Sequence, residues 1–424
     1  MTFLQLISTN PNFSYILKKN PASGMLIKPC RKGRLFAWYT DTQATGYGLD
    51  HKMFNIYFRD SDTMVSYRDE EFEYMDVTRY NAPMFLINAF HEFLNHMKKV
   101  DDKDIIGYEN ILKINQIKCK PRNLHAFESH FQGYEFKFEE VTINNFRIDI
   151  KTNNTIRELI NLGQVLAIFN TLLYDDLYIT DDEIDKYLAC LQIIDSPYYI
   201  RHLFKLYFLR TENLFNKYKK MIEKSDRAKL EFEFGSTLKQ RMTTIRKHLD
   251  FRSHIVDIGC GTGDYVREYA PRLKNHLEYH AIDTNPECIE AVKRLCKRKG
   301  IENIATWSSV DEFTCPDNSD ILMTEVIEHM TKDDAALLIK KVLGWPFRSI
   351  IITTPNKEFN YNYQLEEDDM RNEDHQFEIT KDEFKNWIEE NIKNKEIKIF
   401  DIGDKVNDLR PTLAAIITQS HNNK

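Results

Sequence analysis

A glycine-rich turn that directly follows a short apolar segment is the feature that most constrains the fold of this chain. Residues 255–258 read Ile-Val-Asp-Ile, a β-branched run typical of a parallel strand that is buried on both faces. Three glycines follow at alternate positions: Gly259, Gly261 and Gly263. Glycine lets a backbone turn tightly and approach a ligand closely. The pattern predicts an α/β fold with a doubly wound sheet and a cofactor at its first strand-to-helix turn.

The second predicted strand, residues 279–282, favours a nucleoside-containing cofactor. It ends at Asp283, where a carboxylate is expected to accept the two hydroxyls of a ribose. A nicotinamide cofactor is the alternative for a glycine turn taken alone, but Asp257 before the turn and Cys260 within it favour S-adenosylmethionine. The predicted cofactor contacts are Asp257, Gly259, Gly261, Gly263, Asp283, Ser308, Ser309 and Thr324. The two serines are expected on the adenine side, and ordinary surface serines are the alternative for them.

A Glu-Val-Ile-Glu-His sequence at residues 325–329 follows another apolar segment that reads as a buried strand. If a helix begins there, Glu325, Glu328 and His329 share one face, because positions i, i+3 and i+4 are neighbours on a helix. Carboxylate and imidazole ligands on one face suit a hard or borderline divalent cation. The alternative is a helix start that lines a cofactor pocket or cleft without metal.

A second polar cluster, residues 371–378, favours the metal interpretation. It reads Arg-Asn-Glu-Asp-His-Gln-Phe-Glu, and His375 within it provides a ligand that three residues of one helix face cannot supply. The loop Thr-Thr-Pro-Asn-Lys-Glu-Phe-Asn, residues 353–360, lies between the two clusters and follows a further apolar strand. The predicted metal ligands, which are also the predicted catalytic residues, are Glu325, Glu328, His329 and His375.

The order of these motifs resembles that of the HEN-type small-RNA 3′-terminal ribose 2′-O-methyltransferases. The resemblance covers about residues 235–419 and departs at Ile379, where the family usually has an aromatic residue at a packing position. It implies S-adenosylmethionine as the methyl donor and magnesium or manganese at the four predicted ligands. We also predict RNA contacts by Arg241, Asn356 and Arg371. The family pattern places Arg241 towards the substrate cleft, and an ordinary surface arginine is the alternative.

The implied chemistry explains why a metal and a methyl donor occur together. Four protein ligands leave room for the two vicinal hydroxyls of a terminal ribose, and coordination lowers the pKa of an alcohol as it does that of water. A neutral imidazole that is not a ligand is an alternative proton acceptor. A vicinal diol exists only at the 3′ end, so such a site selects RNA termini and excludes 3′-phosphorylated RNA. A metal-independent small-molecule O-methyltransferase with the same donor loop is the alternative, but it leaves His375 without a role.

Composition indicates two or three domains without a membrane span. A chain of 424 residues exceeds one common core, and its apolar runs stay below the roughly 18–20 residues of a span. No signal peptide is recognisable, and the seven cysteines lack a CxxC pair, which predicts reduced thiols in a cytoplasm.

The formal net charge of −7 argues against a broadly basic nucleic-acid surface, and we expect no DNA binding. It does not exclude RNA, because an enzyme that captures one terminus needs few phosphate contacts. Local basic segments occur at residues 217–220 and 293–299, for which solvated helix faces are the alternative.

A charged linker at residues 223–236 divides the chain. Residues 237–424 are expected to form the methyltransferase domain, beginning with an amphipathic helix and ending with an antiparallel hairpin of residues 397–402 and 413–418. The preceding half is predicted to hold two α+β subdomains, residues 1–103 and 104–222. Its predicted strands lie at residues 4–9, 35–39, 52–58 and 135–143, and its predicted helices at 84–98, 155–173, from 181 onward, and 200–220.

The first half also resembles the amino-terminal module of bacterial members of the same family, through residues 3–9, 15–21, 80–86 and 177–186. That resemblance implies a hetero-oligomeric RNA repair complex with a polynucleotide kinase–phosphatase and an RNA ligase. In that complex this module would dock on the ligase and activate it. It further implies methylation of ribotoxin-cleaved tRNA before sealing. A scaffold of such a complex without catalytic activity is the alternative.

Overall fold

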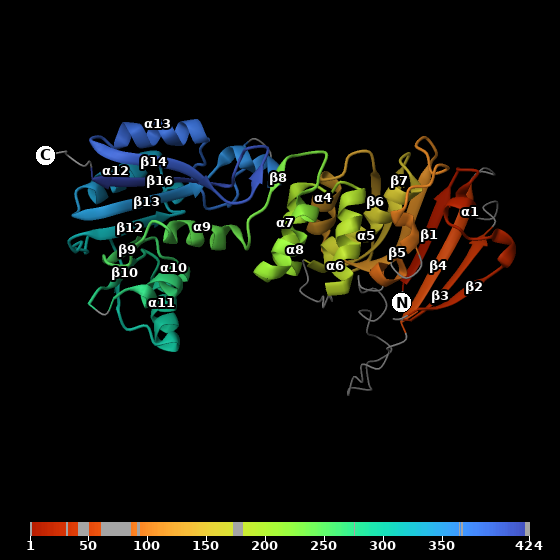
Figure 1. Ribbon diagram of the computed structural model, residues 1–424, viewed down its shortest axis with the longest axis horizontal. Helices are drawn as coiled ribbons and strands as arrows, with labels where there is room; N and C mark the ends of the chain where they lie inside the picture. Colours follow the sequence, from red (N-terminus) through yellow and green to blue (C-terminus); the bar gives the residue numbers. More distant parts are fainter. Residues whose placement is uncertain are drawn as a thin grey trace. The chain divides into compact units, whose positions relative to one another are not determined.

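The computed structural model divides the chain into two compact units, Met1–Arg227 and Ala228–Lys424 (Figure 1). It describes residues 2–30, 33–40, 51–60, 86–90, 94–172, 181–274, 276–363, 365 and 368–419. The boundary between the units falls inside the predicted linker.

One seven-stranded antiparallel sheet organises the first unit, in the order β2-β3-β4-β1-β5-β7-β6. Its strands are β1 (Thr2–Ser8), β2 (Leu26–Cys30), β3 (Gly33–Thr40), β4 (Lys52–Asp60), β5 (Asn110–Lys118), β6 (Glu135–Thr142) and β7 (Asn145–Thr152). The four strands predicted in this half are therefore confirmed. Because β1 pairs with β5, the sheet crosses the division predicted between residues 103 and 104, and both predicted subdomains belong to one unit.

The helical elements of the first unit include some that were not predicted, among them α1 (Phe13–Ile16) and α4 (Pro121–Ser129). The others are η1 (Pro21–Ser23), η4 (Asn95–Lys98), α5 (Ile156–Leu172), α6 (Asp181–Ile193), α7 (Tyr198–Phe208) and α8 (Glu212–Glu223). The single helix predicted over residues 200–220 is wrong, because the chain leaves helical geometry and Thr211 caps a new helix by accepting from the Leu214 amide.

Part of the sequence evidence lies outside the described residues. Of the helix predicted at residues 84–98, residues 86–90 are helical and Asn95–Lys98 forms η4. Residues 80–85 and 177–180, which contributed to the resemblance, are not among those described. Within the described part of the chain, no helix combines the length and hydropathy needed to cross a membrane.

The second unit has the predicted doubly wound sheet, in the order β11-β10-β9-β12-β13-β16-β14. The first five strands are parallel, and the last two form the predicted antiparallel closure. The strands are β9 (Ile255–Ile258), β10 (Tyr279–Ile282), β11 (Ile304–Trp307), β12 (Ser319–Thr324), β13 (Phe347–Pro355), β14 (Lys395–Ile402) and β16 (Thr412–Gln419). A separate short pair joins β8 (Leu230–Glu231) to β15 (Lys405–Val406).

Helices cover both faces of this sheet, as the ribbon diagram shows (Figure 1). One core cluster packs α9 (Thr237–Arg246), α10 (Asp264–Tyr269) and α11 (Pro286–Lys299) against the sheet, and another packs α12 (Lys332–Leu343) and α13 (Lys381–Asn391). The shorter helices are η5 (Ala270–Arg272), η6 (Ile327–His329) and η7 (Lys357–Tyr363). Since β9, β10, β12 and β13 run parallel, their carboxyl ends bring the predicted site segments to one edge of the sheet.

Candidate functional site

The glycine turn after β9 has the backbone geometry that only glycine adopts easily. Gly259, Gly261 and Gly263 have φ angles of 72°, 52° and 90°. A Cβ on Gly259 would lie 2.5 Å from Val326 Cγ2, and one on Gly263 would lie 3.1 Å from side chains of α11. A Cβ on Gly261 would meet nothing within 4 Å. Two glycines thus permit close packing, and the third borders open space that a ligand can enter.

Asp283 fastens this turn to the end of β10. Its Oδ2 accepts a hydrogen bond from the Gly261 amide at 2.8 Å, and its Oδ1 accepts from the Asn285 amide at 2.9 Å. The residue is only partly buried, so further lone pairs of the carboxylate face outward. Such a carboxylate suits the hydroxyls of a ribose, and its contact with a cofactor stays a prediction.

The other predicted cofactor contacts occupy different environments. Asp257 is fully buried in β9, where its Oδ2 accepts from the Tyr279 hydroxyl at 2.7 Å, and burial raises its pKa to about 7. Ser308 donates to Glu312 at 2.7 Å, and Ser309 accepts from the Asp311 amide at 3.1 Å, both just beyond β11. Thr324 is buried at the end of β12.

The segment after β12 is a tight turn and not the predicted α-helix. Glu325 has a φ of 56°, and the short η6 follows it. The chain must reverse here at the carboxyl end of a buried strand, so Glu325 does not share a helical face with the next acid. Glu328 is completely buried, and its Oε2 accepts from Thr354 Oγ1 at 3.1 Å while its Oε1 has no hydrogen-bond partner. Burial, together with the charge of Glu325, holds the pKa of Glu328 well above its usual range.

Two histidines form a group with Glu328. Glu328, His329 and His375 each offer a ligand atom, and these atoms lie within 4.8 Å of one another. The imidazole rings of the two histidines meet edge to face, with centroids 4.9 Å apart. Although 46 positions separate the histidines in sequence (375 − 329), Gln376 joins their segments: its amide donates to Glu328 O at 2.7 Å and its side chain to His329 O at 3.2 Å.

Each histidine has a carboxylate at Nδ1. His375 Nδ1 lies 2.6 Å from Glu378 Oε1, and both side chains are almost fully buried. His329 Nδ1 lies 3.2 Å from the exposed Asp374. A carboxylate at Nδ1 places the ring proton on that nitrogen and the lone pair on Nε2, the usual arrangement of a metal-ligating histidine. In His375 this lone pair accepts a long hydrogen bond of 3.3 Å from Asn372 Nδ2, which a metal ion would have to displace. An unpartnered buried carboxylate oxygen and two imidazoles oriented in this way form a donor set that fits a divalent cation.

Glu325, the fourth predicted ligand, has other partners. Its carboxylate forms an ion pair with Arg241 of α9 and accepts from Thr353 Oγ1 at 3.1 Å. The structure thus brings together three of the four predicted ligands and places Arg241 beside the fourth. Metal binding by Glu325 and RNA contact by Arg241 stay predictions.

Asn356 and Arg371, predicted to contact RNA, brace the loops of the site. Asn356 is buried, donates to Arg410 O at 2.9 Å and accepts from the Glu358 amide at 3.1 Å. Arg371 donates to Asn360 Oδ1 at 2.6 Å and to the carbonyl oxygens of Asn356 and Pro411. Their contact with RNA stays a prediction.

Sequence reasoning missed the residues that hold the ligands. Glu378 and Asp374 orient the histidines, and Thr353 and Thr354 position the two glutamates. Glu378 and Asp374 both belong to the quoted cluster at residues 371–378, where Glu378 lies three residues after His375, an available signal. Asp374 is far from His329 in sequence, so no local spacing indicated that pair. The two threonines open the quoted segment of residues 353–360, but threonine at the end of a buried strand is common for packing alone, so the sequence does not show that they bond the glutamates.

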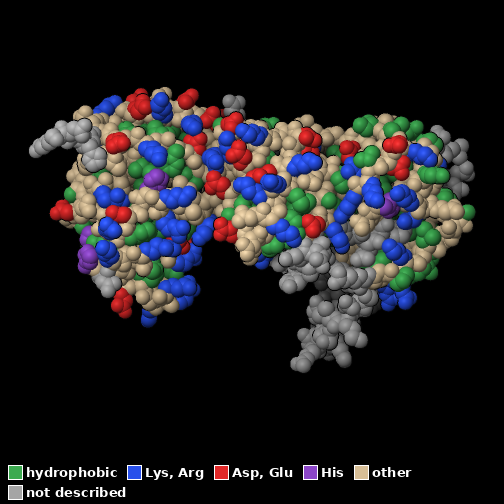
Figure 2. Space-filling view, in the orientation of Figure 1, with side chains coloured by type: hydrophobic (Ala, Val, Ile, Leu, Met, Phe, Trp, Pro, Cys, Tyr) green, Lys and Arg blue, Asp and Glu red, His purple; other side chains and the backbone are tan. Residues whose placement is uncertain are grey.

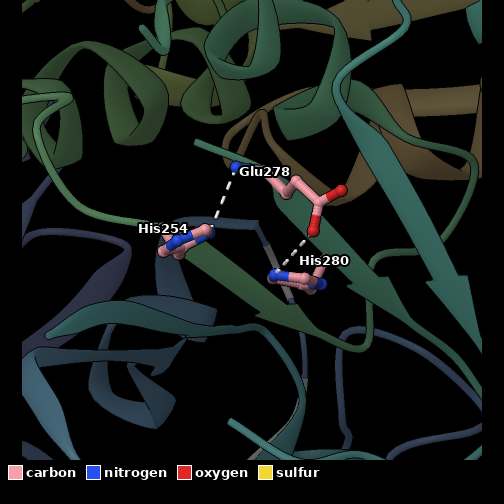
Figure 3. Close-up of side chains that lie close together, drawn as sticks. All are labelled: His254, Glu278 and His280. Atoms are coloured by element: carbon pink, nitrogen blue, oxygen red, sulfur yellow. Dashed lines mark hydrogen bonds and ion pairs between the residues drawn. The ribbon is translucent and has the colours of Figure 1, made fainter. Parts of the chain in front are cut away.

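A second histidine–glutamate group among the described residues lies at the opposite, amino-terminal edge of the strands (Figure 3). His254 and His280 flank Glu278, whose Oε2 lies 3.9 Å from His280 Nε2. His254 Nδ1 accepts from the Glu278 amide at 3.1 Å, which uses the lone pair of a neutral imidazole. The group therefore offers a metal two free ligands, fewer than a structural or catalytic site requires.

Two family models match the chain, one in each unit. The family model of the Hen1 N-terminal domain matches residues 3–227, and that of a methyltransferase domain matches residues 255–345. Among solved structures, the chain is similar to one of the Pnkp1/Rnl/Hen1 RNA repair complex, with a TM-score of 0.81 and 26% identity over 98% of this chain and 100% of that one. A second structure of a Pnkp1/Rnl/Hen1 complex gives a TM-score of 0.79 and 26% identity over 99% of this chain and 100% of that one.

Curated relatives match over shorter stretches. A small RNA 2′-O-methyltransferase of Caenorhabditis elegans is 39% identical over 71 residues, 16% of this chain and 16% of that protein. One of Arabidopsis thaliana is 30% identical over 185 residues, 35% of this chain and 18% of that protein. The chain thus spans less than a fifth of the length of these two relatives.

Proposed function

The chain belongs to the Hen1 family, and on that premise we propose that it transfers a methyl group from S-adenosylmethionine to the 2′-hydroxyl of the 3′-terminal ribose of RNA. The observation that carries the proposal is the position of Glu328, His329 and His375 next to the glycine turn. Gly259 of the turn lies directly against Val326, two residues before Glu328, so donor and metal sites share one edge of the sheet.

The donor is held by the turn and by Asp283. Gly261 leaves space that the cofactor would enter, and Asp283, which accepts from the Gly261 amide, would also accept hydrogen bonds from the ribose hydroxyls. Asp257 acts from within the sheet, where its hydrogen bond with Tyr279 fixes β9 against β10 beneath the turn. Ser308, Ser309 and Thr324 are proposed contacts along the same edge.

Glu328, His329 and His375 would hold a magnesium or manganese ion, with Glu325 as the proposed fourth ligand. When bound, the ion would act as a Lewis acid that lowers the pKa of a ribose hydroxyl. Thr354 keeps one oxygen of Glu328 in place and leaves the other free, and Glu378 fixes the tautomer of His375. Arg241 neutralises Glu325 beside Glu328, which reduces the repulsion between two acids that adjoin the site.

The biological setting that we propose is repair of cleaved tRNA in the cytoplasm. The likeness to structures of a Pnkp1/Rnl/Hen1 complex over nearly the whole chain supports a kinase–phosphatase and a ligase as partners. The first unit would dock on the ligase and activate it. The described cysteines are all free thiols, in agreement with a reducing compartment.

Methyl transfer from labelled S-adenosylmethionine to short RNAs that differ in their last nucleotide tests the proposal. We expect manganese-dependent labelling of an RNA with a terminal 2′,3′-diol, and none when that nucleotide is 2′-deoxy or 3′-phosphorylated. Labelling of the 2′-deoxy RNA would place the methyl group elsewhere and overturn the assignment. Equal labelling in chelator would favour a metal-independent mechanism.

A further inference from the structure

A basic groove lies between α10 and α11, on the face of the sheet opposite α12 and α13. It encloses about 520 Å³, and the residues that line it include Thr262, Asp264, Arg267, Arg294 and Arg298. We call it the α10–α11 groove. Three guanidinium groups from two helices therefore border one cavity, in a chain whose formal net charge is −7.

The charge of the groove is only partly neutralised. Arg267 pairs with Asp264 at 2.8 Å, whereas neither Arg294 nor Arg298 forms an ion pair with any described acid. These two arginines are four positions apart on α11, so they share one face of that helix. Figure 2 shows Lys and Arg side chains gathered over α10 and α11.

Helix electrostatics explain only part of this arrangement. Cations in a last helical turn interact favourably with the helix dipole, which accounts for Lys297, Arg298 and Lys299. Arg294 lies before that turn, and Arg267 belongs to another helix. Their convergence on one cavity, with two arginines unpaired, indicates a site for an anion.

The groove begins at the sheet edge that carries the proposed methyl-transfer site. Thr262 borders the groove and is also part of the glycine turn. Gly259 of the same turn packs against Val326, next to Glu325. Gly263 lies so close to Val292 and Leu295 of α11 that the turn and the arginine-bearing helix form one packed unit. The groove and the proposed methyl-transfer site therefore share the glycine turn.

We propose that the α10–α11 groove binds internucleotide phosphates of the RNA on the 5′ side of the terminal ribose, an inference that rests on the proposed function. A guanidinium group forms two parallel hydrogen bonds with a phosphate, so Arg294 and Arg298 suit neighbouring phosphates of one strand. Such contacts fix the strand without reading its sequence. The groove is thus a site that positions RNA of any sequence.

The test compares Arg294→Gln/Arg298→Gln with Lys340→Gln/Lys385→Gln, which removes the same charge from exposed positions of α12 and α13. The first measurement is the affinity of each full-length variant for a fluorescent single-stranded RNA of about 20 nucleotides, titrated against salt. Each phosphate contact contributes about 0.7 to the slope of log affinity against log salt, so losing two should reduce the slope by about 1.4. The lysine variant should keep the slope of the unaltered protein.

The second measurement is methyl transfer with manganese, to that RNA and to a trinucleotide too short to reach the groove. The arginine variant should raise the KM for the long RNA severalfold, leave its kcat unchanged, and methylate the trinucleotide as the unaltered protein does. Arg294→Lys/Arg298→Lys, which keeps both positive charges, should keep most of the affinity.

Three results would overturn the proposal. One is an unchanged salt slope in the arginine variant, and another is an equal loss in the lysine variant. The third is intact RNA binding combined with failed assembly with the kinase–phosphatase and ligase, which would assign the groove to an acidic protein surface. If no RNA is methylated by any variant, the proposed function fails, while the affinity measurement still decides whether the groove binds RNA.

Discussion

Changing Glu378 to glutamine probes the support of the candidate metal site with the smallest change in shape. The Glu378 carboxylate accepts from His375 Nδ1 at 2.6 Å, from the Arg371 amide at 2.8 Å and from Asn360 Nδ2 at 2.6 Å. Both of its oxygens therefore face donors. A glutamine has one acceptor oxygen, so in either orientation its amide NH2 points at a donor and at least one hydrogen bond is lost.

The expected loss of metal affinity follows from this contact. A hydrogen bond with a charged partner contributes about 1.5–3 kcal/mol net, and about 1.4 kcal/mol corresponds to a tenfold change in an equilibrium constant. Glu378→Gln should therefore weaken Mn²⁺ binding by roughly 10–100-fold, as substitutions next to metal-ligating histidines commonly do. Asp374→Asn makes the same acid-to-amide change beside His329, but Asp374 is largely exposed, so the loss there should be about fivefold or less.

Manganese affinity is measured by calorimetry or by the electron paramagnetic resonance signal of free Mn²⁺, with S-adenosylhomocysteine affinity and melting temperature as controls for folding. Glu390→Gln, on the exposed face of α13, is the matched control and should leave manganese affinity unchanged. A Glu378→Gln protein that is folded and binds manganese as the Glu390→Gln protein does would refute the role given to Glu378. A larger loss for Asp374→Asn than for Glu378→Gln would refute the assignment of the effect to burial.

Further predictions separate the donor site, the metal site and the sheet. Glu328→Ala should abolish methyl transfer and leave S-adenosylhomocysteine affinity unchanged in calorimetry, whereas Asp283→Ala should weaken that affinity by about tenfold or more and leave manganese binding intact. Gly259→Ala places a methyl group 2.5 Å from Val326 Cγ2 at a φ of 72°, so it should destabilise the fold by about 1–3 kcal/mol in denaturant unfolding. Burial raises the pKa of Asp257 from 3.8 to about 7, so between these values the folded protein binds more protons than the unfolded chain and stability falls as pH rises. The asparagine in Asp257→Asn does not titrate. The free energy of unfolding of this variant, taken relative to that of the unaltered protein, should therefore rise by up to about 4 kcal/mol across that pH window and stay level above pH 7. A difference that stays constant across the window would contradict the raised pKa of Asp257.

The methyltransferase half of the fold was predictable because its signals are local. A buried strand, a glycine turn and an acid at the next strand end each act within a few residues, and their order determines the doubly wound sheet. The helix predicted over residues 200–220 failed for a local reason as well, since Thr211 caps a new helix within a continuous apolar pattern. The division between residues 103 and 104 failed for a non-local reason: β1 pairs with β5 across more than a hundred residues, and spacing in sequence does not reveal such pairing.

The candidate site shows the same limit. The sequence identified the acids and histidines, but it predicted a helix at Glu325. The chain instead takes a left-handed turn there, so Glu325 and Glu328 do not share a helical face. The contacts that assemble the site come from elsewhere in the chain. Gln376 joins His375 to the segment after β12, and Arg241 reaches Glu325 from α9. Such contacts depend on tertiary packing and leave no periodic pattern in the sequence.

The central claim is that Glu328, His329 and His375 hold a divalent ion on which transfer to a terminal 2′-hydroxyl depends. The most direct test measures the initial rate of methyl transfer to a diol-ended RNA as a function of Mn²⁺ concentration, alongside the fraction of protein with bound Mn²⁺ in the same samples. We predict that rate and occupancy rise together, and that His375→Ala shifts both curves to higher concentration. A full rate in chelator, or a rate that is saturated while no Mn²⁺ is bound, would contradict the account.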